Sequence, residues 1–365
     1  MSTTTNVNPR LEALTKAGVS VWLDQISRSL IESGELARLV AEDSLRGMTS
    51  NPSIFEKAIL GSEDYDADLE EHVREQLSPR EIYDRIAVKD VQLAADVLAG
   101  VHRESHRRDG FVSLEVAPDL AFDTERTIDG ARMYWKALGR PNVMIKIPGT
   151  PEGAPAIERA IYEGININVT LLFAVEAYER VAEAYLRGLE RRQAEGLSLD
   201  INSVASFFVS RVDTNVDKKL EELGRTDLQG RAAVANARAA YRRFKEIFSG
   251  PRWEALHHAG AAVQRPLWAS TGTKNPNYSD TMYVDELVGP HTVNTMPMAT
   301  LQAVGDHGHV SGPTAEHDPS EDLKALAEAG IDMNQVTDEL LADGVDQFKD
   351  AMSRLIEGIE KAAPR

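Results

Sequence analysis

Residues 142–148 read NVMIKIP, a short run of β-branched and apolar side chains that encloses a single lysine, Lys146. Seven other short apolar or β-branched runs occur along the 365 residues, and longer stretches with helical spacing separate them. This alternation is typical of parallel strands that are joined by crossover helices. The eight predicted strands are Ser20–Asp24, Gly47–Asn51, Val112–Val116, Asn142–Pro148, Ile165–Thr170, Ile201–Ser210, Arg265–Thr271 and His291–Pro297.

The segments between these runs have the pattern of amphipathic helices. Over Asp123–Leu138, apolar side chains recur at helical spacing behind Asp123 and Thr124, which can cap a helix. Another helix is predicted directly after the fifth strand, over Leu171–Leu189. A doubly wound open sheet usually has fewer strands and a glycine-rich first turn, which is missing here. The sequence therefore predicts a closed (β/α)8 TIM barrel, which is an α/β fold.

The whole chain, residues 1–365, is predicted to form one domain, because no obvious linker, repeat or low-complexity tract interrupts it. The barrel should occupy residues 19–310. The two longest gaps, after the second and the sixth strand, should carry inserted helices that include the charged stretch Arg211–Ile247. Helical periodicity in the tail predicts C-terminal helices over residues 319–363, and we expect them to pack across the barrel.

The composition limits the possible partners. A net charge of -18 argues against binding to nucleic acid or to a membrane surface, because both need a basic face. Without cysteine there is no disulfide, no thiol nucleophile and no cysteine-bound metal. Met1–Arg10 is polar, and no apolar run is long enough to span a bilayer, so we expect a cytoplasmic protein. The sequence is compatible with a monomer or a homodimer.

Polar side chains gather near the carboxyl ends of the predicted strands. They fall on the face that alternates with the apolar one, which points into the lumen of a parallel barrel. Barrel enzymes place their chemistry at this end, so the coincidence predicts an active site there. The polar residues in question are Asp24, Asn51, Glu115, Lys146, Asn168, Thr170, Ser206 and Ser270.

Lys146 is the most informative of these residues, because its neighbours in the strand are apolar. Such a lysine must either extend to solvent or occupy a site that uses it. Desolvation favours the neutral amine, which can attack a ketone, and Asp24 and Glu115 could supply the proton transfers. Alternatively, Lys146 is a strand-end lysine, and the two carboxylates are its salt-bridge partners.

Three segments together resemble the transaldolase family. They are VMIKIP at residues 143–148, MTSNPS at residues 48–53 and ININVTLLF at residues 165–173. The similarity runs in order from Val19 to Met296, and the insertions and the C-terminal tail are similar to those of the larger, actinobacterial-type members. The resemblance implies that Lys146 forms a Schiff base with the substrate and that Asp24 is the general acid and base of carbon–carbon cleavage.

The same resemblance implies roles for further residues. Glu115 and Thr170 would orient a catalytic water, and Asn51 and Asn168 would contact the bound dihydroxyacetone unit. The sixth predicted strand also matches a family motif, whose arginine binds the substrate phosphate. The matching residues there are Ser206, Phe208 and Arg211.

The chain departs from the family after the seventh predicted strand. Many members have Ser-Phe-Arg there, whereas this chain has STGTK at residues 270–274. We expect Ser270 to lie at the substrate and Lys274 to replace the second phosphate-binding cation. The residues alone leave another interpretation open, in which Arg211 opens a helix and pairs with Asp213, and Lys274 is free in a loop.

The resemblance implies a transaldolase of the non-oxidative pentose phosphate pathway. It would move a dihydroxyacetone unit from sedoheptulose 7-phosphate or fructose 6-phosphate to glyceraldehyde 3-phosphate or erythrose 4-phosphate. No cofactor is expected, because a protonated imine is itself an electron sink. Two alternatives are a Schiff-base aldolase that releases free dihydroxyacetone and a non-catalytic barrel that binds sugar phosphates, with Lys146 as a phosphate ligand.

No metal site is predicted. His257–His258 and Asp306–His309 lack the spacing of a zinc site and a third ligand on a neighbouring element, so we interpret them as loop histidines. Gly272–Lys274 does not fit the nucleotide-binding P-loop pattern. Its backbone amides could still bind a phosphate.

Overall fold

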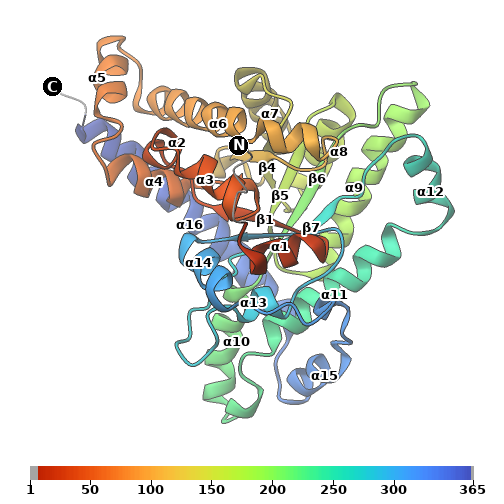
Figure 1. The fold of residues 1–365 in the computed structure, drawn as a ribbon. Helices are drawn as coiled ribbons and strands as arrows, with labels where there is room; N and C mark the ends of the chain where they lie inside the picture. Colours follow the sequence, from red (N-terminus) through yellow and green to blue (C-terminus); the bar gives the residue numbers. More distant parts are fainter. Residues whose placement is uncertain (1–6, 363–365) are drawn as a thin grey trace, which may run out of the picture.

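The computed structural model describes residues 7–362, in which eight parallel strands close into a barrel in sequence order, with β1 beside β8. Helices surround the barrel, and this arrangement confirms the predicted TIM barrel (Figure 1). Parts of the predicted N-terminal segment and of the predicted tail, residues 1–6 and 363, fall outside the described residues. The strands are β1 Val19–Asp24, β2 Leu45–Thr49, β3 Phe111–Glu115, β4 Val143–Pro148, β5 Ile167–Leu172, β6 Ser203–Phe208, β7 Arg265–Ala269 and β8 Thr292–Met296.

Helices connect the strands, and the two long gaps carry several each, as predicted. Within residues 7–362, no helix is both long and apolar enough to cross a membrane. The α-helices are α1 Pro9–Lys16, α2 Arg28–Glu32, α3 Glu35–Glu42, α4 Pro52–Leu60, α5 Asp66–Arg74, α6 Pro79–Glu104, α7 Thr124–Leu138, α8 Gly153–Glu163, α9 Val175–Ala194, α10 Ser210–Glu222, α11 Ala232–Ile247, α12 Gly250–His258, α13 Met282–Asp285, α14 Met298–His307, α15 Ser320–Glu328 and α16 Met333–Ala362. Three short 3₁₀ helices are η1 Pro118–Leu120, η2 Thr226–Leu228 and η3 Thr314–Glu316.

The observed strand ends differ from the predicted ones by up to two residues, and the second strand shows why. We predicted a strand over Gly47–Asn51, but β2 ends at Thr49. Asn51 is the N-cap of α4, and its side chain accepts a hydrogen bond of 3.0 Å from the backbone N–H of Ile54. The first N–H groups of a helix have no partner within the helix, so an asparagine at this position stabilises the next element.

The predicted start of the helix after the fifth strand is wrong. We expected a helix to begin at Leu171, but β5 continues to Leu172 and α9 begins at Val175. Leu171 has a φ of 57°, in the left-handed region, and the pairing with β6 changes register between Val169 and Leu172. A non-glycine residue in this region is uncommon, and a periodic pattern of side chains does not reveal it.

A polar cluster fills the amino-terminal end of the barrel interior. Asp109 accepts a hydrogen bond of 2.8 Å from the indole N–H of Trp22 and a further one from the hydroxyl of Ser20. Arg265, the first residue of β7, donates to Ser20 Oγ at 2.7 Å. A Cβ atom on Gly47 would lie 2.4 Å from the ring of Trp22, so only glycine leaves room for the indole. Packed and hydrogen-bonded side chains therefore connect β1, β2, β7 and the segment before β3 at this end of the barrel.

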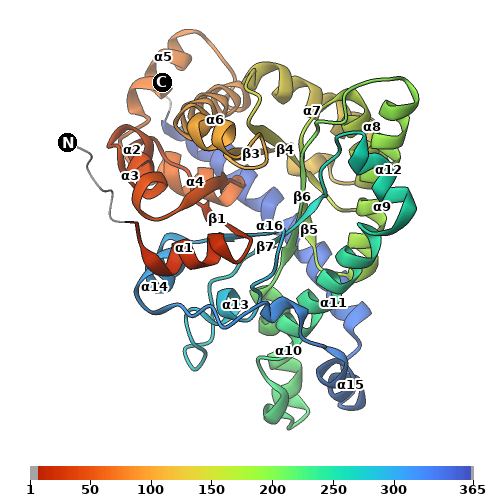
Figure 2. The ribbon, with the colours of Figure 1, turned by 45° about the vertical axis from the view of Figure 1, so that its right-hand side comes forward.

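Helix α16 crosses the carboxyl-terminal end of the barrel, as predicted for the tail. It packs against α4, η1, β5 and α10, which belong to or follow the ends of different strands, and Figures 1 and 2 show it running beside α4. Arg354 lies 2.6 Å from Glu56 of α4, and Glu339 accepts a hydrogen bond of 2.8 Å from Lys219 of α10. These two ion pairs connect α16 to opposite sides of the barrel opening.

Candidate active site

The structure brings the predicted polar residues together at the carboxyl-terminal end of the barrel. Strands β1, β3, β4, β5 and β6 each contribute a side chain to the interior, and α10 and the loop after β7 contribute from above it. Most of these side chains are buried, whereas Lys274 is exposed. The predicted residues concerned are Asp24, Asn51, Glu115, Lys146, Asn168, Thr170, Ser206, Phe208, Arg211, Ser270 and Lys274.

Lys146 is buried and does not extend to solvent, being only 4% exposed. Its Nζ atom donates a hydrogen bond of 2.8 Å to the backbone carbonyl of Ser50 and lies 3.3 Å from Oε2 of Glu115. Strands β3 and β4 pair with Glu115 opposite Lys146, which fixes the two side chains next to each other. The lysine is therefore held in the interior with one carboxylate in reach for a proton transfer.

Glu115, beside Lys146, and Thr170, near the end of the neighbouring strand β5, have unpaired polar atoms. Apart from the ion pair, neither carboxylate oxygen of Glu115 has a hydrogen-bond partner within residues 7–362, and the same is true of the hydroxyl of Thr170. Burial raises the pKa of Glu115, although the charge of Lys146 opposes the shift. Buried polar groups in folded proteins are nearly always hydrogen-bonded, so unpaired ones at a strand end mark a place where water or a ligand can bind.

Asp24 lies at the end of β1, opposite Thr49 of β2. The Thr49 hydroxyl donates to Oδ1 of Asp24 at 2.6 Å and lies 2.7 Å from the hydroxyl of Thr295 on β8. Burial raises the pKa of Asp24, and the charge of Lys146 and the Thr49 hydrogen bond oppose this rise. A carboxyl group with a raised pKa that is held near a lysine is suited to accept and return a proton during a reaction.

A hydrogen-bond network lies in the barrel interior beside Lys146. Asn168 of β5 donates through Nδ2 to Ser113 Oγ at 3.0 Å, and its Oδ1 accepts from Ser206 Oγ at 2.6 Å. Asn168 pairs with Lys146 in the sheet, and both side chains point into the lumen as the alternation predicted. Asn51 lies at the start of α4, where its carbonyl oxygen caps the helix and its amide nitrogen is left for other contacts.

Arg211 is the second residue of α10, and its charge interacts with Asp24 and Glu115 of the site. Its Nη1 atom is buried without a hydrogen-bond partner among the described residues. The guanidinium lies 5.3 Å from the ring of Phe208 and 5.9 Å from the ring of Phe348 on α16. The alternative pairing with Asp213 is wrong, because Asp213 accepts hydrogen bonds from Tyr283 and from a backbone N–H instead. A guanidinium with a buried nitrogen that lacks a partner is well suited to bind an anion.

The loop after β7 places Ser270 and Lys274 above the same opening. Ser270 has a φ of 56°, and its hydroxyl lies 2.8 Å from that of Ser210 at the start of α10. Lys274 is exposed, but its charge and that of Arg211 both counteract the rise in the pKa of Asp24. The two cations therefore act on the same carboxylate from neighbouring strand ends.

Some residues of the site were not predicted from the sequence. Thr49 and Thr295 hydrogen-bond around Asp24, and the alternation of polar and apolar residues in β2 and β8 could have indicated both. Phe348 and Gly344 of α16 lie at Arg211, where a Cβ on Gly344 would come within 3.7 Å of Nη1. Nothing in the tail sequence connects these two residues to a site that is more than a hundred residues away.

The histidines lie apart from this site. His257 and His258 end helix α12, and His307 ends α14, so the interpretation as loop histidines is wrong for these three. His307 contacts Asp280 at 2.8 Å and Asp306 at 3.0 Å. Within residues 7–362, no group of three or more histidine, aspartate or glutamate side chains is arranged to hold a metal ion.

Comparison with known proteins identifies close relatives over nearly the full length. The family model described as "Transaldolase/Fructose-6-phosphate aldolase" matches residues 21–359. A transaldolase from Saccharopolyspora erythraea is 49% identical and covers 98% of each chain. One from Thermobifida fusca is 49% identical and covers 96% of this chain and 97% of its own. One from Trichodesmium erythraeum is 47% identical and covers 97% of this chain and 98% of its own. The family match extends beyond Met296, where the similarity seen in the sequence ended, and includes most of α16.

Proposed function

This chain belongs to the transaldolase family, and on that premise we propose that it transfers a dihydroxyacetone unit between sugar phosphates through a Schiff base on Lys146. The donor would be sedoheptulose 7-phosphate or fructose 6-phosphate, and the acceptor glyceraldehyde 3-phosphate or erythrose 4-phosphate. The observation that carries the proposal is the buried amine of Lys146, 3.3 Å from Glu115 and near enough to Asp24 to affect its pKa, with the pKa values of both carboxyl groups raised by burial.

The geometry supports a stepwise reaction in which the imine on Lys146 accepts the electron pair of the broken C3–C4 bond. The amine of Lys146 adds to the C2 carbonyl of the ketose phosphate, and loss of water leaves a protonated imine. Asp24 takes the proton of the C4 hydroxyl, and the C3–C4 bond breaks. Its electron pair moves into the imine to give an enamine, and the shortened aldose phosphate leaves. The enamine carbon then attacks the aldehyde of the acceptor, whose oxygen regains a proton from Asp24.

Glu115 and Thr170 are suited to the steps that gain or lose water. Dehydration of the carbinolamine releases a water molecule at C2, and hydrolysis of the imine adds one there, next to the nitrogen of Lys146. The unpaired oxygens of Glu115, 3.3 Å from that nitrogen at the nearest, and the unpaired hydroxyl of Thr170 can hold it. Glu115 would accept a proton from this water during hydrolysis and return it during dehydration.

The substrate phosphate would bind at the outer edge of the site. The chain carries a net charge of -18, so a phosphate dianion must rely on local cations. Arg211 offers a buried guanidinium nitrogen, Nη1, without a partner among the described residues, and Lys274 and the loop amides before it lie at the neighbouring strand end. Neighbouring loops of a barrel commonly converge on one phosphate.

Chemical trapping tests the role of Lys146. The enzyme is incubated with fructose 6-phosphate and borohydride, and the modified peptide is identified by mass spectrometry. We expect a reduced adduct on Lys146 alone, and we expect Lys146→Arg to lose both the adduct and turnover, because arginine keeps the charge but cannot form an imine. Lys136→Arg, at an exposed position on α7, is the control and should behave as the wild type. An adduct on another lysine would contradict the assignment.

A Schiff-base aldolase is the second candidate, because the matching family model names both activities. An aldolase hydrolyses the enamine intermediate and releases free dihydroxyacetone, whereas a transaldolase holds it for the acceptor. We expect fructose 6-phosphate alone to give little free dihydroxyacetone, and added erythrose 4-phosphate to start rapid transfer. Equal rates of cleavage with and without an acceptor would favour the aldolase. A non-catalytic sugar-phosphate-binding protein would give neither product nor borohydride adduct.

A further inference from the structure

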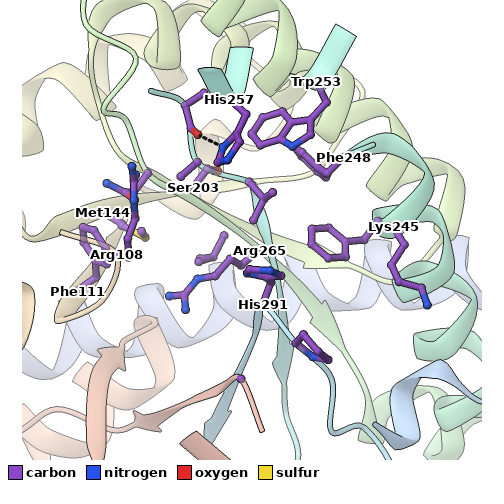
Figure 3. A pocket seen from close by; sticks show the side chains of 18 residues that line it. Arg108, Phe111, Met144, Ser203, Lys245, Phe248, Trp253, His257, Arg265 and His291 are labelled. Atoms are coloured by element: carbon purple, nitrogen blue, oxygen red, sulfur yellow. Dashed lines mark hydrogen bonds between the residues drawn. The ribbon is translucent and has the colours of Figure 1, made fainter. Parts of the chain in front are cut away.

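A large cavity lies at the amino-terminal end of the barrel, away from the candidate active site. Its volume is about 730 Å³, which is within the roughly 300–1,000 Å³ of sites that bind small molecules. The first residues of β3, β6 and β7 contribute to its walls, as do α11 and α12 (Figure 3). Met144 of β4 also lines it, two residues before Lys146. The cavity therefore shares a strand with the active site but opens at the other end.

The charge of the cavity lining is opposite to that of the chain. Arg108, Lys245 and Arg265 line the cavity, and no aspartate or glutamate is among the described residues that do so. The chain as a whole carries a net charge of -18. A cationic concavity on an acidic protein attracts anions locally, because short-range contacts dominate over the distant and screened charges.

These cations make only loose contacts with carboxylates outside the lining. The nitrogen–oxygen separations are 3.6 Å for Arg108–Asp200, 3.4 Å for Lys245–Glu316 and 3.5 Å for Arg265–Asp109. Charge-assisted hydrogen bonds are normally about 2.7–2.9 Å long. Arg252, on the outer side of α12, has such a bond of 2.6 Å with Glu190. Among the described residues, the one short hydrogen bond from these cations is that of Arg265 Nη1 to Ser20 Oγ at 2.7 Å, so their pairing with carboxylates is weaker than that of an ordinary surface pair.

An aromatic wall lies across from the two arginines. The rings of Phe244 and Phe248 are 5.4 Å apart, and that of Trp253 meets Phe248 edge to face at 5.0 Å. In Figure 3, Arg265 extends toward Arg108, and Trp253 and Phe248 lie on the other side of the cavity. All three aromatic side chains are at least nine-tenths buried, so their remaining surface is the part that a flat ligand in the cavity could cover.

We propose that this cavity binds a small aromatic anion, with a phosphate monoester held by Arg108 and Arg265 and its ring system against Phe244, Phe248 and Trp253. Two guanidinium groups favour phosphate, because their planar forks match its oxygens. The ring stacks on, or packs edge-on against, the aromatic wall. This site is separate from the one that binds sugar phosphates, and it does not depend on the proposed reaction.

Calorimetry with 1-naphthyl phosphate tests the proposal on the full chain. The probe combines a fused ring with a phosphate monoester and fits within the cavity volume. We expect one molecule to bind per chain and to quench the fluorescence of Trp253. Inorganic phosphate and 1-naphthol each provide half of the contacts, and each should bind about tenfold or more weakly, since a charged hydrogen bond or a buried ring contributes at least that much.

Two neighbouring arginines provide a matched pair of variants. Arg108→Ala should weaken the binding of 1-naphthyl phosphate about tenfold. Arg107 is the adjacent residue and pairs with the same aspartate, Asp200, at 2.8 Å, but it does not line the cavity. Arg107→Ala therefore removes an equal charge, and the Kd of 1-naphthyl phosphate should be unchanged in this variant. Trp253→Leu should also weaken the binding. The test does not depend on that variant folding, because the Arg108 side chain is 43% exposed and its removal leaves the core intact.

Arg211→Ala distinguishes the cavity from the candidate active site. Binding that survives Arg211→Ala and falls in Arg108→Ala supports the proposal. Binding that is lost in Arg211→Ala and unaffected by Arg108→Ala places the probe at the active site and overturns it. The absence of saturable binding overturns it as well. If no probe binds, and sedimentation shows a dimer that Trp253→Leu dissociates, then a second copy of the chain covers this face and the proposal is wrong.

Discussion

The two ends of the barrel interior both bury charged side chains, but only the amino-terminal end satisfies them. There, Asp109 accepts hydrogen bonds from Trp22, from Ser20 and from the backbone N–H of Gly110, and Arg265 lies beside it. Within the described residues, no side-chain atom of this cluster is buried without a partner. The cluster connects β1, β7 and the segment before β3, and it stabilises the closed barrel.

The carboxyl-terminal end has the opposite character. The oxygens of Glu115, the hydroxyl of Thr170 and Nη1 of Arg211 are buried without hydrogen-bond partners in residues 7–362. Each such group costs about 1–3 kcal/mol of folding free energy. Natural proteins tolerate such costs mainly at functional sites. The comparison indicates that buried charge alone does not identify a site in this barrel, and that the buried charges at the carboxyl-terminal end differ by their unused hydrogen-bonding capacity.

The largest effect should come from removing the carboxyl group of Asp24. We expect Asp24→Ala to slow cleavage about 10²–10⁴-fold, which is the usual loss when a general acid or base is removed. Trapping of the imine by borohydride should persist, because Lys146 remains. The measurement is steady-state turnover of fructose 6-phosphate with erythrose 4-phosphate. Wild-type turnover in this variant would remove Asp24 from the mechanism.

The pH dependence tests the same residue. As a base, Asp24 must be ionised, so activity is lost as the pH falls through its pKa. Burial raises this pKa, against the opposing effects of Lys146, Thr49, Arg211 and Lys274. The acidic limb of kcat should therefore lie at a higher pH than for an exposed aspartate, and Asp24→Asn should remove it from the remaining activity. An unchanged acidic limb in the variant would assign it to another group.

A smaller effect is expected at the phosphate. Arg211→Ala should lower kcat/KM for fructose 6-phosphate about 10- to 150-fold, the equivalent of roughly 1.5–3 kcal/mol for a lost charged hydrogen bond. Lys274→Ala should have a smaller effect, since this side chain is exposed. Fructose without a phosphate should lose far less in both variants. Equal losses for the two sugars would show that neither residue recognises the phosphate.

At the amino-terminal end, removing a carboxylate charge should alter the stability of the fold and not the rate of the reaction. Asp109→Asn keeps the shape of the side chain but removes the charge beside Arg265. We expect the free energy of unfolding in urea to fall by about 1.5–3 kcal/mol, while kcat of the folded enzyme stays within about twofold of the wild type. A large loss of kcat with normal stability would show that the amino-terminal cluster contributes to catalysis and not to the stability of the fold.

The smallest effect is predicted for the contact between α16 and Arg211. A Cβ on Gly344 would lie 3.0 Å from Cδ2 of Leu171, which would have to move slightly, and in ordinary van der Waals contact at 3.7 Å with Nη1 of Arg211, so Gly344→Ala should disturb the packing around the guanidinium slightly. We expect KM for fructose 6-phosphate to rise about two- to fivefold, the equivalent of about 0.5–1 kcal/mol. Gly358→Ala, also on α16, is the control, because the nearest atoms that its Cβ would meet belong to the side chain of Leu60, which is exposed. The same rise in KM in both variants would show that the contact with Arg211 is not the cause.

The barrel and much of its site could be predicted because both follow from local patterns. Alternating short apolar runs and helical segments predict parallel strands with crossover helices. Along a strand, successive side chains point to opposite faces, so the side chains of Glu115, Lys146 and Asn168 could be placed in the lumen before the fold was known. The structure confirms that Lys146 pairs with Glu115 and Asn168 across β3, β4 and β5.

Tertiary structure alone decided which distant groups meet. Thr49 and Thr295 are 246 positions apart, and they hydrogen-bond beside Asp24 only because the barrel closes. The left-handed backbone of Leu171 and the position of α16 above Arg211 depend likewise on packing between distant segments. Periodicity records which face of a strand or helix is buried. It does not record which other face covers it, because that depends on the summed contacts of the whole chain.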